Sequence, residues 1–279
     1  MTSLVIPRSV SQLYTIQPYL SFNAKKNSDI RIMNDSPISH FYNFEANTRD
    51  SVVTLVPDAC IEIFFLCDGE QSEVHLYGSP LCAKNLDIRA GQRYFGVRYK
   101  PGEMPDFLKI NPKLLIDSEY KLQDIFPGNG KLLEKIAKTK AFEEQILLFN
   151  QLPIDNVSHK LPTKSEDLAH QIYQLITENN GALLMKDIVV YLGFSDRYIN
   201  RSFTDKFGYS PKIYALILRF QDTLKKILVE KSLNLTDLAS DQGYSDQSHF
   251  YREFKKYTTL APSIFLKKLN HLEGASRFF

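Results

Sequence analysis

The chain has 279 residues, a formal net charge of +2, and 43% hydrophobic and 24% charged residues. A prior of about 100–200 residues per domain favours two domains, and this apolar content excludes wholesale disorder. The overall charge does not indicate whether the protein binds nucleic acid. Its distribution is uneven: residues from 163 onward include 16 Lys/Arg and 13 Asp/Glu, whereas the residues before 163 include 18 Lys/Arg and 19 Asp/Glu.

The sequence favours a cytoplasmic protein without a membrane partner. Residues 1–14 show no basic stretch followed by an apolar one, so we expect no signal peptide. The longest apolar run, Ile61–Cys67, is broken by Glu62 and is far shorter than the roughly 20 residues that span a bilayer. The three cysteines are odd in number and lack C-x-x-C spacing, as is usual in a reducing compartment.

Residues 1–105 are predicted to form an antiparallel β-sandwich or barrel-like domain. Short segments rich in Val, Ile, Phe and Tyr alternate with turn clusters at intervals of about ten residues. These segments are Ser51–Val56, Ile61–Cys67, Glu73–Tyr77 and Arg93–Tyr99. Residues 106–152 are predicted to be a helical extension, because Lys131–Thr139 and Ala141–Gln151 carry apolar residues at helical spacing.

A linker is predicted over residues 153–164, a polar stretch that contains Pro153 and Pro162. The first 152 residues would then form a sensory or oligomerisation domain. Residues 165–270 are predicted to form a second, all-α domain, which makes the expected fold class α+β.

The C-terminal domain contains an internal repeat with a period of about 50 residues. Gly-Phe-Ser-Asp at 193–196 returns as Gly-Tyr-Ser-Asp at 243–246, and each copy is followed by a phenylalanine and then by a proline eight residues later. Each glycine stands where a left-handed residue would end a short amphipathic helix. Ser195 and Ser245 then stand at predicted N-caps of a second helix. The repeat therefore predicts two helix-turn-helix units.

The second helix of each unit has one apolar face and one face of polar side chains. Residues of these polar types bind base edges and phosphates. The candidate DNA-binding residues are Arg197, Asn200, Arg201, Gln247, Ser248, Tyr251 and Arg252. Between the units, an apolar stripe from Ile213 to Leu228 predicts one long helix, which would hold the two units about one DNA turn, roughly 34 Å, apart.

Residues 165–269 resemble the DNA-binding domain of the AraC/XylS transcription regulators. The most specific segment is Gly-Tyr-Ser-Asp-Gln-Ser-His-Phe at 243–250, with the following Phe254, Lys255, Lys256 and Pro262. The resemblance implies two helix-turn-helix units joined by a long helix, with the residues named above on their DNA-contacting faces. Thr259 departs from the family, which usually has glycine there, and Val189 replaces a small alanine.

The N-terminal part looks like a β-domain found ahead of this module in such regulators. The matching segments are Val56–Cys60, Tyr77–Pro80 and Gly96–Gly102. This resemblance implies a sensory or oligomerisation role. Arg98 and Lys100 alternate with Val97 and Tyr99, so they either line a pocket for an anionic effector or face solvent.

The sequence thus predicts a bacterial, ligand-responsive transcription regulator that binds promoter or operator DNA. Its partners would be duplex DNA and a small-molecule effector, with RNA polymerase and a second copy of the chain as further candidates. The alternative is an adaptor that acts through protein contacts without specific DNA binding. We expect no enzymatic activity, no cofactor and no metal, because no nucleotide, nucleophile or metal-ligand motif is present. His249 is expected to be a partly buried structural residue.

Overall fold

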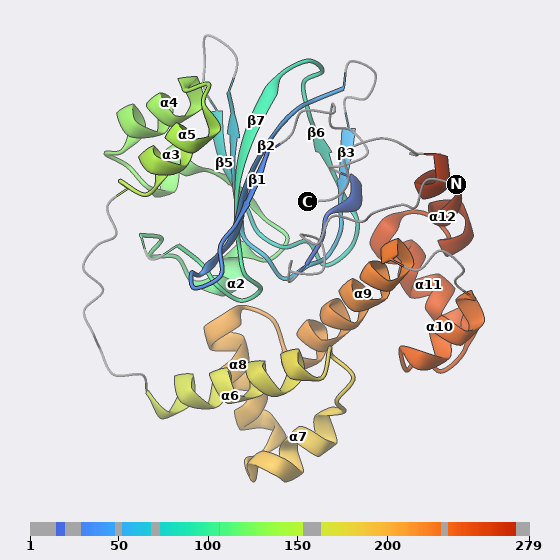
Figure 1. Ribbon diagram of the computed structural model, residues 1–279. Coiled ribbons are helices and arrows are strands. Elements are labelled where there is room, and N and C mark those ends of the chain that lie inside the picture. Colours follow the sequence, from blue (N-terminus) through green and yellow to red (C-terminus); the bar gives the residue numbers. More distant parts are fainter. Residues whose placement is uncertain are drawn as a thin grey trace.

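The computed structural model describes residues 15–19, 29–47, 52–67, 73–105, 107–152, 163–229 and 234–271. An N-terminal part built on antiparallel sheets precedes a C-terminal part made of helices (Figure 1). The predicted α+β class, with two helix-turn-helix units joined by a long helix, is confirmed. The predicted linker falls mostly outside the described residues, which omit 153–162.

The described strands form two sheets. The larger sheet has the order β1-β2-β7-β4-β5-β8 and the smaller one pairs β3 with β6, with antiparallel neighbours throughout. The four segments predicted as strands are β3, β4, β5 and β7. The strands are β1 (Ile30–Ile32), β2 (Ile38–Glu45), β3 (Val52–Leu55), β4 (Glu62–Leu66), β5 (Glu73–Tyr77), β6 (Lys84–Asp87), β7 (Arg93–Tyr99) and β8 (Glu119–Lys121).

Both faces of the larger sheet are covered. Successive side chains of a strand point to opposite faces, so β4 contributes Ile63 and Phe65 to one core and Phe64 and Leu66 to another. The first core lies under the helical extension: α2 (Pro112–Leu115), α3 (Leu122–Ile125), α4 (Gly130–Lys138) and α5 (Phe142–Phe149). The short strand β8 lies inside this extension, which the sequence predicts to be helical throughout.

Two strands of the larger sheet approach each other closely at one point. Gly96 of β7 pairs with Tyr42 of β2, and a Cβ on Gly96 would come within 2.2 Å of the Tyr42 ring. A glycine is therefore required for the Tyr42 ring to lie flat across β7.

The C-terminal part consists of seven helices among the described residues. They are α6 (Lys164–Glu178), α7 (Met185–Leu192), α8 (Asp196–Phe207), α9 (Pro211–Val229), α10 (Leu235–Asp241), α11 (Gln247–Thr258) and α12 (Pro262–His271). Helices α6 to α8 and the first half of α9 share a core of their own, built around Ile199, Phe203 and Tyr214.

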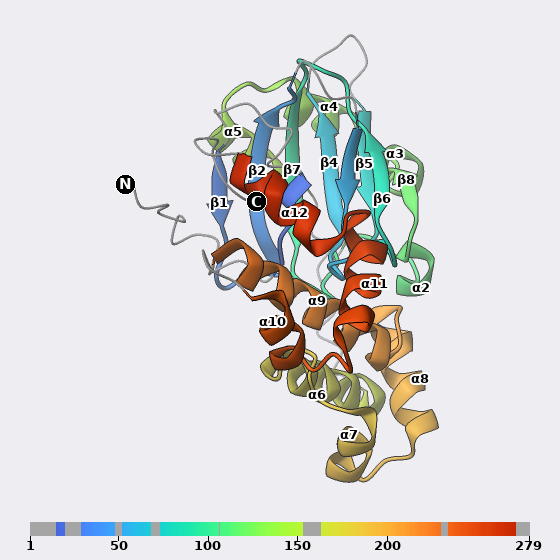
Figure 2. The same ribbon diagram turned by 90° about the vertical axis from the view of Figure 1, so that its right-hand side faces the viewer.

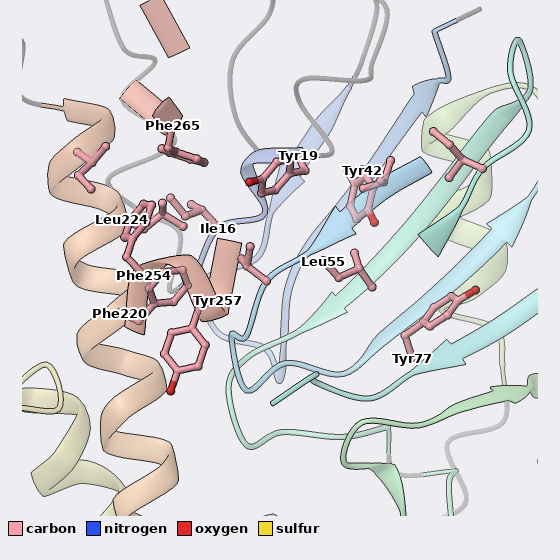
Figure 3. Packing of buried hydrophobic residues seen from close by; sticks show 14 of the residues in the cluster. Ile16, Tyr19, Tyr42, Leu55, Tyr77, Phe220, Leu224, Phe254, Tyr257 and Phe265 are labelled. Atoms are coloured by element: carbon pink, nitrogen blue, oxygen red, sulfur yellow. The ribbon is translucent and has the colours of Figure 1, made fainter. Parts of the chain in front are cut away.

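The second half of the helical part has no separate core. Phe220 and Leu224 of α9, Phe254 of α11 and Phe265 of α12 belong to the same buried cluster as Phe64 of the larger sheet. Figure 2 shows α12 crossing in front of β2 and β7 while α4 and α5 lie behind the sheet. Figure 3 shows this cluster spanning from α9 to the strands. We call it the shared core.

Candidate nucleic-acid interface

The first helix-turn-helix unit consists of α7 and α8. Gly193 ends α7 in a left-handed conformation, with φ 72°, and its N–H donates to the carbonyl of Val189. Ser195 then caps α8, its Oγ accepting from the N–H of Tyr198 at 3.3 Å. These are the cap positions predicted from the sequence. A glycine C-cap followed two residues later by a serine N-cap makes the tight turn that orients α8 relative to α7.

Helix α8 exposes two arginines one turn apart. Arg197 and Arg201 are both exposed, and the guanidinium of Arg201 lies 5.4 Å from the ring centre of Tyr198. Asn200 is half-buried, and its side-chain amide donates to the carbonyl of Asp196 at 2.9 Å. In this state the two arginines are therefore available to a ligand, whereas the Asn200 amide has one donor engaged within its own helix.

The second unit, α10 and α11, departs from the first at its cap. Asn234 caps α10, and Gly243 follows the helix with φ 69°. Asp246, and not the predicted Ser245, caps α11, its Oδ1 accepting from the N–H of His249 at 2.7 Å. The shift by one residue agrees with the spacing from glycine to phenylalanine, which is one residue longer in this copy.

The cap also has an electrostatic role. The backbone N–H of His249 holds the pKa of the Asp246 carboxyl below its usual value. The carboxylate is therefore charged at neutral pH, at the positive end of the α11 dipole.

Helix α11 exposes Gln247, Ser248 and Arg252. The side chain of Gln247 donates to Thr236 Oγ1 at 3.3 Å, which ties it to α10. Tyr251, also predicted on this face, is half-buried and packs against the shared core. Arg252 is thus an exposed cation of this face, and Lys255, three residues further along α11, is exposed as well.

His249 is the partly buried histidine expected from the sequence. Its ring packs edge-on against Tyr244 with centroids 5.5 Å apart, and its Nδ1 lies 3.2 Å from Ser245 Oγ. Both contacts lie within the second unit, so the residue supports the turn.

Helix α9 holds the second unit through a half-buried arginine. Nη2 of Arg219 donates to both carboxylate oxygens of Glu253 on α11 at 3.2 Å, and the guanidinium lies 4.3 Å from the ring centre of Tyr244. Hydrogen bonds between charged partners are among the strong ones in proteins. At its other end α9 begins at Pro211, capped by Ser210, and buries Tyr214 against Phe203 of α8. One helix therefore positions both recognition helices.

The residues named for an effector pocket lie elsewhere. Arg98 is buried, with ion pairs to Asp58 and, at 3.1 Å, to Glu62. Lys100 donates to the carbonyl of Asn34 at 2.7 Å. A role for these two residues in effector binding remains a prediction.

The Arg98 cluster is buried beside the helical part. Burial lowers the pKa of Arg98 to about 10 and raises that of Glu62 to about 7. Asp58 is 1% exposed and also accepts from the side chain of Gln17 at 2.7 Å. The loop that carries Asp58 contacts the helices directly, because the carbonyls of Pro57 and Ala59 accept from Gln221 and Tyr209.

Gln221 is the residue that sequence reasoning missed. It is 1% exposed, on the face of α9 that is otherwise apolar. A polar residue inside the apolar stripe of a predicted helix is the signal that could have found it, since buried polar groups require partners.

Two segments of the chain match known families. Residues 188–268 match the family described as a helix-turn-helix domain. This part of the chain is similar to AraC-type helix-turn-helix domains, as its sequence predicts. Residues 35–121 match a domain of unknown function, DUF6597.

The AraC-type domain has relatives among characterised proteins. The Msm operon regulatory protein of Streptococcus mutans is 24% identical over 125 residues, which is 44% of this chain and 44% of that protein. The match thus spans less than half of the relative. ToxT from Vibrio cholerae aligns over 86% of this chain and all of its own, with 15% identity and a TM-score of 0.44. The C-terminal domain of AraT from Geobacillus stearothermophilus aligns over 38% and 88%, with 20% identity and a TM-score of 0.35.

Neither a metal centre nor a membrane-spanning helix is found among the described residues. They contain no group of His, Cys, Asp and Glu side chains arranged to hold a metal ion. In the same residues, no helix has the length and apolar character needed to cross a bilayer.

Proposed function

We propose that this chain is a sequence-specific DNA-binding transcription regulator in which the β-rich part controls the AraC-type domain. The observation that carries the proposal is that α8 and α11 present Arg197, Arg201 and Arg252 to solvent while α9 holds both helices in place. Arginine is the side chain best suited to guanine edges and phosphates.

Control by the β-rich part is supported by the shared core. Because α9, α11 and α12 bury apolar side chains against the larger sheet, a change in that sheet alters the packing of the second unit. The signal would be a small-molecule effector or a partner protein. RNA polymerase and a second copy of the chain remain predicted partners.

The test is a titration of the full-length protein against its own upstream intergenic DNA, with random duplex as competitor, over a range of salt concentrations. We expect selective binding that weakens steeply with salt, because each phosphate contact contributes about 0.9 to the slope of the logarithmic plot. The variant with both Arg197→Ala and Arg201→Ala should lose affinity and slope. Lys131→Ala, which removes an exposed cation from α4, is the matched control.

The result also decides between the two hypotheses. Equal affinity of the double variant and the Lys131→Ala control would remove α8 from the interface. Folded protein that does not select its upstream DNA would favour the adaptor that works through protein contacts.

A further inference from the structure

A second site lies in the N-terminal part, at the end of the shared core away from α9. A cavity of about 520 Å³ opens between β5 of the larger sheet and β6 of the smaller one. Its size is within the range of small-molecule sites, roughly 300–1,000 Å³. We call it the β5–β6 cavity.

One wall of the β5–β6 cavity is aromatic. The rings of Phe64 and Tyr94 stack with centroids 4.9 Å apart, and Tyr77 stands at 75° to Phe64 with centroids 6.2 Å apart. The His75 ring also stacks on Tyr77, with centroids 5.9 Å apart. Aromatic rings that line a cavity attract cations through the negative charge of their faces.

The other wall is acidic. Glu73, Asp87 and Glu119 line the cavity, and Arg89 is the one lysine or arginine that does so among the described residues. Arg89 is already paired with Glu73 at 3.0 Å. Burial alone would raise the pKa of Glu73, but the hydrogen bond and charge of Arg89 lower it, so this carboxylate is charged. The lining thus has three carboxylates against one guanidinium, which leaves an excess of negative charge.

The polar group of Tyr77 adds no charge of its own to the negatively charged wall. The hydroxyl of Tyr77 donates to Glu119 at 3.0 Å, and burial together with the Glu119 charge raises the pKa of Tyr77. Tyr77 thus stays a neutral donor, and its ring faces the cavity without adding charge. His75 lies between the two glutamates, 2.9 Å from Glu119 and 3.5 Å from Glu73.

We propose that the β5–β6 cavity binds a small organic cation, a quaternary ammonium or amidinium compound, and that this cation is the effector of the regulator. An anion would face this excess of negative charge, and a neutral compound would gain nothing from Asp87 and Glu119. The binding step stands on the cavity alone, whereas the effector role rests on the proposed function.

The cavity is connected to the DNA-binding helices by direct packing. Phe64, Tyr77 and Tyr94 line the cavity and also belong to the shared core, together with Phe220 and Leu224 of α9. Figure 3 shows Tyr77 at the strand end of this core and Phe220 and Leu224 at its helical end. A ligand that moves these rings therefore acts on the packing that holds the second helix-turn-helix unit.

The experiment uses titration calorimetry on the full-length protein. The probes are choline, benzyltrimethylammonium and the carbon isostere of choline, in which a tert-butyl group replaces trimethylammonium. We expect choline to bind about tenfold more tightly than its isostere. The variant with both Asp87→Asn and Glu119→Gln should weaken choline binding by about tenfold. Glu134→Gln, on α4 behind the sheet, should not.

Each outcome has a distinct meaning. Equal binding of choline and its isostere, unchanged choline binding in the double variant, or no binding of either cation overturns the site. Cation binding without any change in affinity for the upstream DNA keeps the site but removes its effector role. Failure of the protein to bind DNA at all would contradict the proposed function, whereas the calorimetric test of cation binding would still be valid.

Discussion

Both polar atoms of the Gln221 side-chain amide form hydrogen bonds with the backbone of Ile16. Its Oε1 accepts from the N–H of Ile16 at 2.8 Å and its Nε2 donates to the carbonyl of Ile16 at 3.3 Å. The same Nε2 donates to the carbonyl of Pro57 at 2.8 Å. A single side chain of α9 thus satisfies backbone groups from two segments of the N-terminal part, in a buried setting where each group would otherwise lack a partner.

Gln221→Leu should destabilise the protein by about 2–3 kcal/mol, because it leaves buried backbone groups unsatisfied. The free energy of unfolding from urea denaturation measures this. Gln123→Leu, an exposed glutamine on α3, should change it little. A loss no larger than that of Gln123→Leu would mean that water or a rearranged loop replaces the amide.

Arg252→Ala should weaken binding to the upstream DNA by about 1–3 kcal/mol, as the loss of a base contact does. Arg252→Lys distinguishes two kinds of contact. Lysine keeps the charge but not the planar fork, so it should restore a phosphate contact and fail to restore a two-pronged contact with guanine. Competition titrations with specific and random duplex measure both variants. If Arg252→Ala bound the upstream DNA with wild-type affinity, Arg252 would not be part of the DNA-binding interface.

Acid should destabilise the protein through His40. This residue is fully buried; burial, and next the charge of Arg98, lower its pKa from 6.5 to about 3. Between these two pH values the unfolded chain therefore binds a proton at His40, whereas the folded chain does not. The stability that neutral His40 provides is complete above pH 6.5 and is lost as the pH falls from there towards 3.

The comparison of pH 7 with pH 5 isolates this effect. The wild type should lose about 2 kcal/mol more than His40→Asn does. The difference between the two proteins is the quantity to measure, because Glu62, whose pKa burial raises to about 7, changes stability with pH in the opposite direction. Substitution of the exposed His170 is the control. Parallel pH profiles for wild type and His40→Asn would contradict the assignment.

Thr259→Gly should stabilise the protein by about 1 kcal/mol. Thr259 ends α11 with φ 64°, in the left-handed region where a branched side chain is strained. Thr259→Ala keeps a Cβ atom in the same conformation, so thermal unfolding should show a gain for glycine that alanine does not reproduce. Equal melting temperatures for the two variants would place the effect outside the backbone.

The sequence predicts elements better than it predicts their contacts. Glycine C-caps, the serine N-cap of α8 and apolar spacing are local signals, and they predict four of the strands, the helices from α4 onward and both turns. The Asp246 cap and the buried half of Tyr251 depend on a one-residue shift and on packing against a distant sheet. Likewise the partners of Arg98, which are Asp58 and Glu62, come from a loop and a neighbouring strand. Nothing in the spacing along the chain brings these groups together.

The acidic cavity was missed for the same reason. Its aromatic wall combines β4, β5 and β7, and its carboxylates come from β5, β6 and β8. Alternation along β5 shows that Glu73, His75 and Tyr77 share a face, but the sequence does not say which strand lies opposite that face.

The shared core has a consequence for how the chain is made. The core behind the larger sheet uses residues up to Leu152, so it can close early in synthesis. The core in front of the sheet needs Phe220, Phe254 and Phe265, which leave the ribosome later. Until they do, the aromatic face of β2, β4 and β7 is exposed. A chain truncated within α9 to α12 keeps this apolar surface exposed, so it is expected to bind chaperones or to aggregate.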